Sequence, residues 1–281
     1  MINNKIFDQE RALYNLHDET VENCRFEGPA DGESALKECR NFTAKKCSFL
    51  LRYPMWHCKN FVAEHCYLAE TCRAPLWYDN NGKLLNCDIR GIKTLRECAD
   101  IEVANCMVVS PEFGWKCKDL LLLNSDFTSE YFLLMSQNVK MTDSKLKGKY
   151  SFQYVTDSVV ENCELNTKDA FWHAKNVIVS DSIVKGEYLA WYAENITFVN
   201  CVIEGTQPLC YCKNLTLINC TMKNCDLAFE YSDVHATING HIDSVVNPLS
   251  GEIVTDSVGE VIMQDAVKEC SGKVIIRNAE K

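Results

Sequence analysis

The chain has 281 residues, a formal net charge of −10 and 47% hydrophobic residues, which is enough apolar material for a large buried core. No run of Lys or Arg interrupts this acidic balance, which argues against a nucleic-acid partner because phosphate backbones are neutralised by clustered positive charge. Residues 1–20 contain no apolar stretch of about seven residues and no stretch of about eighteen occurs elsewhere, so we expect no signal peptide, no membrane span and a cytoplasmic protein.

The first segment, residues 1–20, is predicted to cap one end of the fold. It is interrupted by polar and charged residues and lacks the repeated residue described next; the interruption consists of Asp8, Gln9, Glu10 and Arg11. We expect this segment to cover the first open strand edge.

Residues 21–246 are predicted to form stacked coils, because the chain resembles itself at a stride of 19 residues. A small residue, called the anchor here, recurs at that stride after one first gap of 21, at Cys66, Cys87, Cys106, Ser125, Ser144, Cys163, Ser182, Cys201 and Cys220. Cys24 and Cys47 extend the register backward and Gly240 extends it forward. The register therefore predicts about a dozen coils.

Within each coil, a second polar residue precedes the anchor by six positions. All ten of these residues are Asn or Asp, namely Asn41, Asn60, Asn81, Asp100, Asp119, Asn138, Asp157, Asn176, Asn195 and Asn214. Asn and Asp tolerate turn backbones, and stacked amides can bond from layer to layer, so these residues predict a corner. Apolar residues alternate after it, as in Val177 and Val179, which indicates a half-buried strand.

A further turn is predicted four residues after the anchor. Glycine occupies this position at Gly91, Gly148, Gly186 and Gly205. Each coil is therefore predicted to consist of three short strands and three bends.

The pattern as a whole predicts an all-β fold, a single-stranded parallel β-helix solenoid of about 12 coils with about 19 residues each and with capped ends. We expect one domain over residues 1–281 and a right-handed sense, as in other parallel crossovers. A left-handed helix of hexapeptides and a pentapeptide-repeat fold are the alternatives, but 19 is a multiple of neither six nor five. Residues 247–281 follow a break at Pro248, Ser250 and Gly251 and are predicted to close the other end with short strands at 252–254 and 260–263.

The 17 cysteines are odd in number and follow the repeat, which argues against a secreted disulfide scaffold. Eight are anchors, and five others lie eight residues before an anchor, at Cys39, Cys58, Cys98, Cys117 and Cys212. We expect free thiols that act as small core residues in a reducing cytoplasm. The alternative is a metal site at Cys210 and Cys212 near Cys201, Cys220 and Cys225, but zinc sites favour two to four residues between paired cysteines. We therefore expect no metal and no cofactor.

The segment after the glycine turn carries an unusual number of rings. The position eight after the anchor is apolar, as at Met55 and Phe171, and should point inward, whereas alternation places the neighbouring tryptophans outside. Flat rings in file suit the faces of sugar rings, with polar tips to bond hydroxyls. The candidate ligand-binding residues are Trp56, His57, Tyr150, Tyr154, Asp169, Trp172, His173, Tyr188, Trp191 and Tyr192. The alternative is that the rings stack on one another as a stiffening ladder or cover an oligomer contact.

Catalytic residues stay unassigned. Neighbouring coils could pair Asp169 with Glu187 or Glu112 with Glu130, as a glycosidase needs, and His57 and His173 could act as bases. With 39 acidic residues on about a dozen coils such pairs arise by chance.

Five segments resemble those of an uncharacterised microbial family, catalogued as a domain of unknown function of about this length. They are Leu51–His57, Glu70–Ala74, Ser110–Trp115, Lys168–His173 and Gly205–Cys212. The resemblance covers essentially the whole chain and implies a pectin-lyase-like parallel β-helix, with polysaccharide lyases and hydrolases as relatives in fold. It implies no established activity, so it assigns no catalytic residue.

Two functional hypotheses follow. The first is an intracellular β-helix that binds, and processes if catalytic, a carbohydrate-like ligand along its aromatic face. The second is a non-catalytic scaffold whose aromatic face docks a protein partner or a second copy of the chain, as a homo-oligomer.

Overall fold

The computed structural model describes residues 1–28 and 33–277. Over these residues the chain is an all-β parallel solenoid of about 14 turns with about 19 residues per turn. It divides into two compact units, Met1–Lys145 and Leu146–Lys281. Residues 29–32 of the predicted coils and residues 278–281 of the predicted closing segment lie outside the described residues. The prediction of one domain over residues 1–281 stays a prediction.

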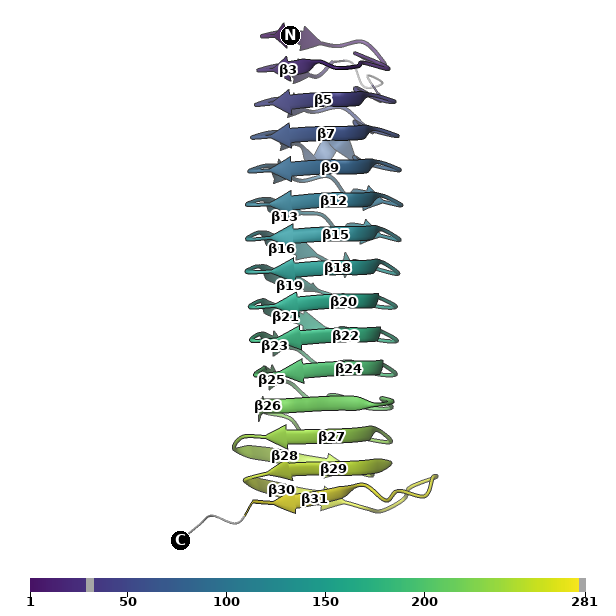
Figure 1. Cartoon of the computed structure of the whole chain (residues 1–281), viewed down its shortest axis with the longest axis vertical. Helices are drawn as coiled ribbons and strands as arrows, with labels where there is room; N and C mark the ends of the chain where they lie inside the picture. Colours follow the sequence, from purple (N-terminus) through teal and green to yellow (C-terminus); the bar gives the residue numbers. More distant parts are fainter. Residues whose placement is uncertain (29–32, 278–281) are drawn as a thin grey trace. The chain divides into compact units, whose positions relative to one another are not determined.

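The first unit is built on a stack of parallel strands in register, as the alternating apolar residues predict (Figure 1). Phe42 lies opposite Phe61, and Val103 lies opposite Leu122, one coil away. Every second side chain of these strands is buried, because successive residues point to opposite faces. The strands are β1 (Ile2–Asn3), β3 (Thr20–Glu22), β5 (Arg40–Lys45), β7 (Lys59–Glu64), β9 (Asn80–Leu85), β12 (Ala99–Ala104), β15 (Lys118–Leu123) and β18 (Gln137–Thr142).

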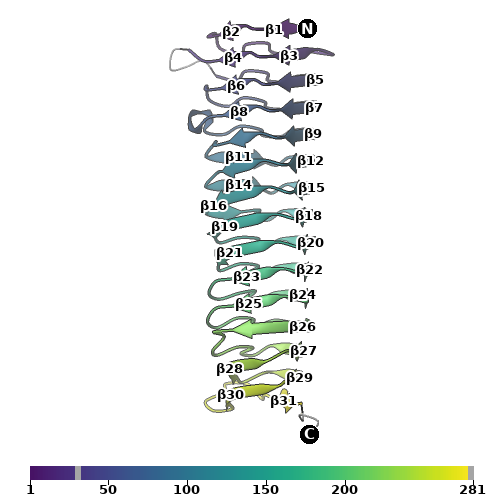
Figure 2. The same cartoon turned by 90° about the vertical axis from the view of Figure 1, so that its left-hand side faces the viewer.

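Shorter strands follow each anchor and form a second face of the same unit (Figure 2). Phe26 and Phe49 lie side by side in this layer, with ring centroids 4.8 Å apart. The strands are β2 (Ile6–Phe7), β4 (Arg25–Phe26), β6 (Ser48–Phe49), β8 (Tyr67–Leu68), β10 (Asp88–Ile89), β13 (Met107–Val109) and β16 (Asp126–Ser129). The next short strand, β19 (Lys145–Lys149), begins at the last residue of this unit and otherwise belongs to the second unit.

The second unit repeats this arrangement with parallel strands in the same register, such as Val177 opposite Ile196. Its long strands are β20 (Thr156–Glu161), β22 (Lys175–Ser180), β24 (Glu194–Val199), β26 (Leu215–Lys223), β27 (Asp233–Ile238), β29 (Ser250–Thr255) and β31 (Lys273–Ile276). Its other strands are β21 (Glu164–Lys168), β23 (Ile183–Lys185), β25 (Val202–Glu204), β28 (His241–Val246) and β30 (Ser257–Ile262).

The turns outnumber the anchors because both ends of the described chain add strands to the stack. Ile2 of β1 pairs with Val21 of β3, so the predicted cap at residues 1–20 contains the beginning of a first turn. At the other end β29 pairs with β31, and β28 pairs with β30. The predicted closing strands at 252–254 and 260–263 fall on β29 and β30.

The anchors lie over one another, as the repeat predicts. The backbone N–H of Cys87 donates to the sulfur of Cys106 at 3.3 Å, and the N–H of Cys106 donates to Oγ of Ser125 at 3.0 Å. In the second unit the N–H of Cys163 donates to Oγ of Ser182 at 3.0 Å. Each anchor therefore helps to fix the height of the next coil.

The predicted Asn and Asp corner is confirmed, and its backbone is left-handed, with φ between 50° and 55° at all ten positions. The amides form the predicted ladder within each unit. Nδ2 of Asn60 donates to Oδ1 of Asn41 at 2.9 Å, and Nδ2 of Asn195 donates to Oδ1 of Asn176 at 3.0 Å. Side-chain bonding therefore compensates the strained backbone at each corner.

The prediction of a third strand in every coil is wrong for most coils. Of the described residues, only β11 (Lys93–Arg96), β14 (Glu112–Trp115) and β17 (Tyr131–Phe132) form such a strand. In the coil before β11, a 3-10 turn at Glu70–Cys72 is followed only by an isolated bridge that Trp77 makes to Trp56 and Arg96. Elsewhere every second residue is left-handed, as at Tyr188, Ala190 and Tyr192, with φ of 58–60°. A strand requires extended angles at consecutive residues, so this alternation curls the segment instead of pleating it.

Candidate functional site

Four rings of the second unit form a continuous stack, called the ring row here. It consists of Tyr154, His173, Tyr192 and Tyr211, each ten residues after an anchor. Successive ring centroids lie 4.8, 5.0 and 4.8 Å apart, and the planes are within 13° of parallel. The spacing is that of neighbouring strands, so the coil repeat itself sets the row. Because the rings cover one another, the row presents edges and polar tips to solvent instead of open faces.

The left-handed residues turn the ring row outward, which the sequence left undecided. Tyr154 and Tyr192 are each 46% exposed, and His173 is half-buried. Within the described residues, the phenol oxygens of Tyr154 and Tyr192 and the imidazole nitrogens of His173 make no hydrogen bond to the protein. The hydroxyl of Tyr211 instead donates to Oε2 of Glu230 at 2.9 Å. Burial and this neighbouring carboxylate raise the pKa of Tyr211 above its ordinary value.

The predicted tryptophans of this unit lie beside the row and are half-buried. Trp172 and Trp191 stack on each other with ring centroids 5.5 Å apart and planes 4° from parallel. Their indole N–H groups donate to the backbone oxygens of Tyr188 and Gln207, both at 2.7 Å. Each tryptophan therefore ties its coil to the next one, and its polar group is already used by the protein.

A shorter version of this arrangement occurs in the first unit. His57 stacks on Tyr78 with centroids 4.9 Å apart, and Trp56 stacks on Trp77 at 5.1 Å. The prediction missed Trp77 and Tyr78 because two extra residues lie between Cys66 and Cys87. Trp56 and Trp77 each lie ten residues before the next anchor, so counting backward from that anchor would have found them. The predicted residues thus fall into two groups, Trp56 and His57 in the first unit and the other eight in the second.

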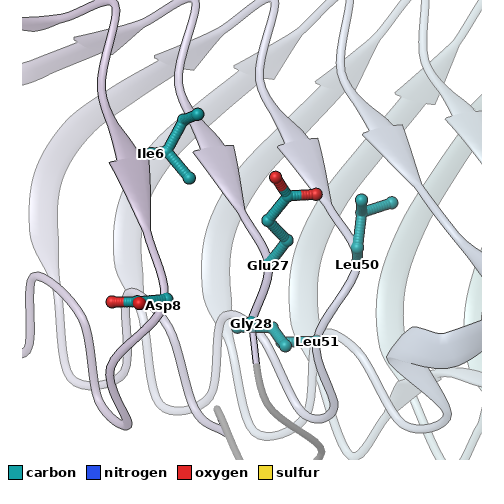
Figure 3. Close-up of a pocket in the computed structure, with 6 residues that line it drawn as sticks. All are labelled: Ile6, Asp8, Glu27, Gly28, Leu50 and Leu51. Carbon is teal, nitrogen blue, oxygen red and sulfur yellow. The ribbon is translucent and has the colours of Figure 1, made fainter.

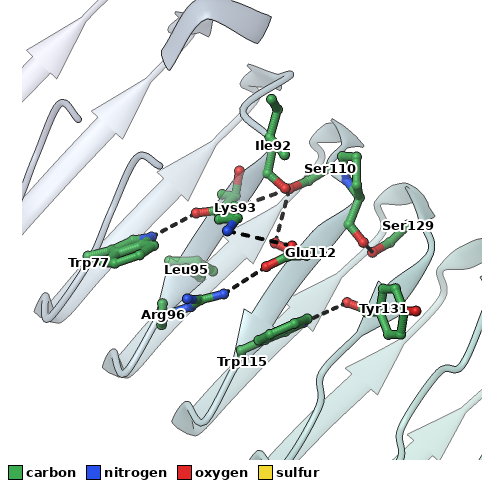
Figure 4. A network of polar contacts seen from close by, with 12 residues as sticks. Trp77, Ile92, Lys93, Leu95, Arg96, Ser110, Glu112, Trp115, Ser129 and Tyr131 are labelled. Carbon is green, nitrogen blue, oxygen red and sulfur yellow. Dashed lines mark hydrogen bonds and ion pairs between the residues drawn. The ribbon is translucent and has the colours of Figure 1, made fainter. Parts of the chain in front are cut away.

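Further along the first unit, a cation takes the place of a ring (Figure 4). The guanidinium of Arg96 lies 4.6 Å from the ring centre of Trp77 and 4.7 Å from that of Trp115. Nη2 of Arg96 also donates to Oε2 of Glu112 at 2.7 Å, and Nζ of Lys93 lies 3.8 Å from Oε1 of the same carboxylate. Glu112 is therefore held by two cations, which makes it a poor candidate for the acid of a glycosidase pair.

Asp169 is the predicted site residue with the most unusual surroundings. It is 6% exposed, and its carboxylate has no hydrogen bond or ion pair to the described residues. Burial raises the pKa of Asp169, the charge of Glu187 raises it further, and Lys168 and Lys149 oppose the shift. Nζ of Lys168 is 3.4 Å from Oε2 of Glu187, so that lysine has another carboxylate partner.

Three depressions of defined volume are lined by residues other than the predicted ones. One of about 480 Å³ lies between Ile6, Asp8, Glu27, Gly28, Leu50 and Leu51 (Figure 3). A second, of about 460 Å³, is lined by Asn105, Cys106, Met107, Asn124, Ser125, Asp126, Asp143 and Lys145. The third, of about 300 Å³, is lined by Thr216, Leu217, Ile218, His235, Ala236, Thr237, Glu252 and Val254. None of these three depressions is lined by a residue of the ring row.

All 17 cysteines fall in the described residues, and every one is a free thiol. Sixteen are buried, and burial raises the pKa of Cys72 and of Cys212 to about 12. Sγ of Cys212 donates to the backbone oxygen of Ala190 at 3.0 Å. In residues 1–28 and 33–277, no three His, Cys, Asp or Glu side chains converge as metal ligands would. The part of the chain described here also has no helix long and apolar enough to span a membrane.

The fold and the row together define a parallel β-solenoid with an external ladder of aromatic rings. The chain belongs to the family described as protein of unknown function DUF3737, whose model matches residues 1–276. No curated protein matches it.

Solved structures with a weak likeness include HetL, a pentapeptide repeat protein of the cyanobacterium Nostoc sp. strain PCC 7120, at 12% identity and a TM-score of 0.30 over 79% of this chain and 92% of that one. The catalytic domain of a GH87 alpha-1,3-glucanase matches at 8% identity and 0.32, over 96% and 62%. PfbA, a surface adhesin of Streptococcus pneumoniae, matches at 10% and 0.26, over 94% and 75%. These scores are too low to carry an argument about function.

Proposed function

We propose that the second unit binds an elongated, carbohydrate-like ligand along the ring row. The observation that carries this proposal is the line of polar tips at Tyr154, His173 and Tyr192, which follow one another at the coil spacing without partners in the described protein. A polymer of hydroxylated rings offers donors and acceptors along its length, so it can bond several tips at once.

The tryptophans have a supporting role in this proposal. Because Trp172 and Trp191 are fixed by backbone hydrogen bonds, they hold the row rigid, and little side-chain entropy is lost when a ligand binds. Binding is the proposed function. Asp169 and Glu187, on adjacent coils, are the carboxylates that a hydrolytic activity would use, and assaying reducing ends during the same incubations tests for one.

The proposal also includes the handedness of the helix, its location in the cell and the class of partner that it excludes. A right-handed, pectin-lyase-like helix is supported by the parallel register of the strands and the general preference for right-handed crossovers. A reducing, cytoplasmic location is supported by the 17 free thiols. The absence of a nucleic-acid partner is supported by the net charge of −10.

The proposal is tested by removing the hydroxyl groups of Tyr154 and Tyr192 while keeping their aromatic rings. Tyr154→Phe combined with Tyr192→Phe should weaken the binding of cellohexaose or xylohexaose, measured by titration calorimetry, by about 30-fold, because two neutral hydrogen bonds of about 1 kcal/mol each are lost. The melting temperature should not change, since neither hydroxyl bonds the described protein. Tyr78→Phe, at an exposed ring of the first unit, is the matched control and should leave the affinity unchanged. Equal affinity in the double variant and the wild type would contradict the proposal.

The second candidate function is a non-catalytic scaffold, and a specific observation favours it. The rings cover one another, and the indole N–H groups donate to backbone oxygens. Stabilisation of the coil stack would therefore be a sufficient reason for these rings to be in file. On this alternative, neither oligosaccharide binds, and Tyr192→Ala converts an oligomer to monomer in sedimentation velocity. Saturable binding of either sugar by the wild type rejects it.

A further inference from the structure

In the second unit, two neighbouring positions carry polar residues where the adjacent coils carry aromatic rings. They are Asp169 and Gln153. Six residues after successive anchors stand Tyr150, Asp169, Tyr188, Gln207 and Asp226, so Asp169 is the one non-aromatic residue between two tyrosines. The backbone hydrogen bonds confirm that these coils are neighbours, since the N–H of Asp169 donates to the oxygen of Glu187 at 3.0 Å and that of Tyr150 to the oxygen of Lys168 at 3.0 Å.

The second missing ring is that of a tryptophan. Nine residues after the preceding anchor stands Gln153, where the next two coils have Trp172 and Trp191. Nε2 of Gln153 donates to the backbone oxygen of Asp169 at 3.2 Å, as the tryptophan indoles do to the equivalent oxygens of their neighbouring coils. Gln153 therefore keeps the bond between the coils while it omits the bulk of an indole beside Asp169.

Asp169 as a residue is only 6% exposed, but its carboxylate oxygens still reach solvent and have no hydrogen-bond partner among the described residues. Because most of the side chain is buried, its charged form is partly desolvated, and no protein donor offsets that cost. A tyrosine, as in the flanking coils, would fill the column without that cost. The lysines nearby are engaged elsewhere, Lys168 with Glu187 at 3.4 Å and Lys149 over the ring of Tyr150 at 4.9 Å.

We propose that Asp169 is the acceptor that anchors a neutral, hydroxyl-rich saccharide to the ring row. An ionised carboxylate accepts hydrogen bonds on both oxygens, so it can hold two adjacent sugar hydroxyls. The row continues from the same coil through His173, which places further polar tips along the ligand. A saccharide bearing carboxylates is disfavoured, because Asp169 and the net charge of −10 both repel it. This inference rests on the proposed function of the ring row.

The test compares two substitutions at one position. Asp169→Asn keeps the shape and removes the charge, and it should weaken the binding of cellohexaose or xylohexaose by about tenfold or more, because hydrogen bonds to charged groups are the stronger class. Asp169→Tyr restores the ring of the flanking coils and should abolish binding while the melting temperature stays equal or rises. The matched control is Asp226→Asn, at an exposed aspartate six residues after the anchor Cys220, which should bind as the wild type does.

The outcomes separate this inference from the proposed function. If the wild type binds a neutral hexasaccharide and both Asp169 variants bind it equally well, the inference is overturned and the row remains a binding site. If the wild type binds trigalacturonate more tightly than the neutral sugars, the assigned ligand class is wrong. If the wild type binds none of the three probes, the proposed function fails and the inference fails with it.

Discussion

At the scale of single residues, the position eight before each anchor usually holds a small side chain, and Asp79 is an exception. The thiols and hydroxyls in this column donate to backbone oxygens of the preceding coil: Cys58 to Leu36 at 3.0 Å, Cys98 to Leu76 at 3.0 Å and Ser136 to Gly114 at 2.5 Å. Asp79 occupies the same column and is 1% exposed. Its Oδ1 accepts from the N–H of Cys58 at 2.7 Å, but its Oδ2 has no partner.

Only the protonated form of Asp79 can donate as its column neighbours do. Burial raises the pKa of Asp79 well above its ordinary value of 3.8, and the thiol of Cys98 raises it further. The folded protein therefore retains a proton that the unfolded chain releases. Stability from this group is fully present below about pH 4 and is lost as pH rises toward the folded-state pKa.

The substitution Asp79→Ser should stabilise the first unit at neutral pH. Serine can accept from the N–H of Cys58, as Ser136 accepts from Cys117 at 3.0 Å, without burying an acid. We expect a gain of about 1 to 3 kcal/mol in the free energy of unfolding at pH 7, shrinking toward pH 4, from urea titrations at both values. Cys98→Ser, in the same column, is the control and should show no such pH dependence. A loss of stability at pH 7 in Asp79→Ser would show that the carboxyl group is well accommodated.

At the scale of an element, the corner depends on both backbone and side chain. Nδ2 of Asn214 donates to Oδ1 of Asn195 at 2.9 Å, and Asn195 itself donates to Asn176. The left-handed φ of 54° at Asn195 would strain most residues. Two physical effects are thus combined at one position, and two substitutions can separate them.

Replacing Asn195 should reveal both effects. Asn195→Gly removes the amide bonds but tolerates the left-handed backbone, so we expect a cost of about 1 kcal/mol. Asn195→Ala loses the same bonds and adds backbone strain, so its cost should be about 1 to 2 kcal/mol larger. Thermal and urea unfolding of both variants measure the difference. Equal stability of the two would mean that the corner backbone is not strained.

At the scale of the whole molecule, cysteine is used as a small core residue in both units. Thirteen of the 16 buried thiols lie in the two columns that serine or alanine fills in other coils, and only Cys270 among the 17 is partly exposed. Their burial, more than the compartment, protects them from reagents.

Thiol labelling tests this use of cysteine. In native protein, dithionitrobenzoate should react quickly with about one thiol, that of Cys270, and with all 17 after unfolding in urea. The variant Cys270→Ser should show almost no fast reaction. Rapid labelling of several thiols in that variant would indicate that the coils open readily or that the columns are not buried as described.

The repeat made much of this protein predictable. The anchors, the Asn and Asp corners and the inward position of Met55 and Phe171 follow from a fixed stride, because in a solenoid equivalent residues of successive coils have equivalent neighbours. Trp77 was missed because a local insertion shifts the stride.

What the sequence by itself determined is the stacking of coils and which side chains share a column, since a constant period admits one alignment of neighbours. What only the tertiary structure decided is the path of the third segment and the direction of its rings. Aromatic residues favour strands, but outside the coils of β11, β14 and β17 every second residue of this segment is left-handed, and the coil closes without a strand. That backbone turns Tyr154 and Tyr192 outward, leaves the carboxylate of Asp169 without a protein partner, and so creates the surface on which the proposed function depends.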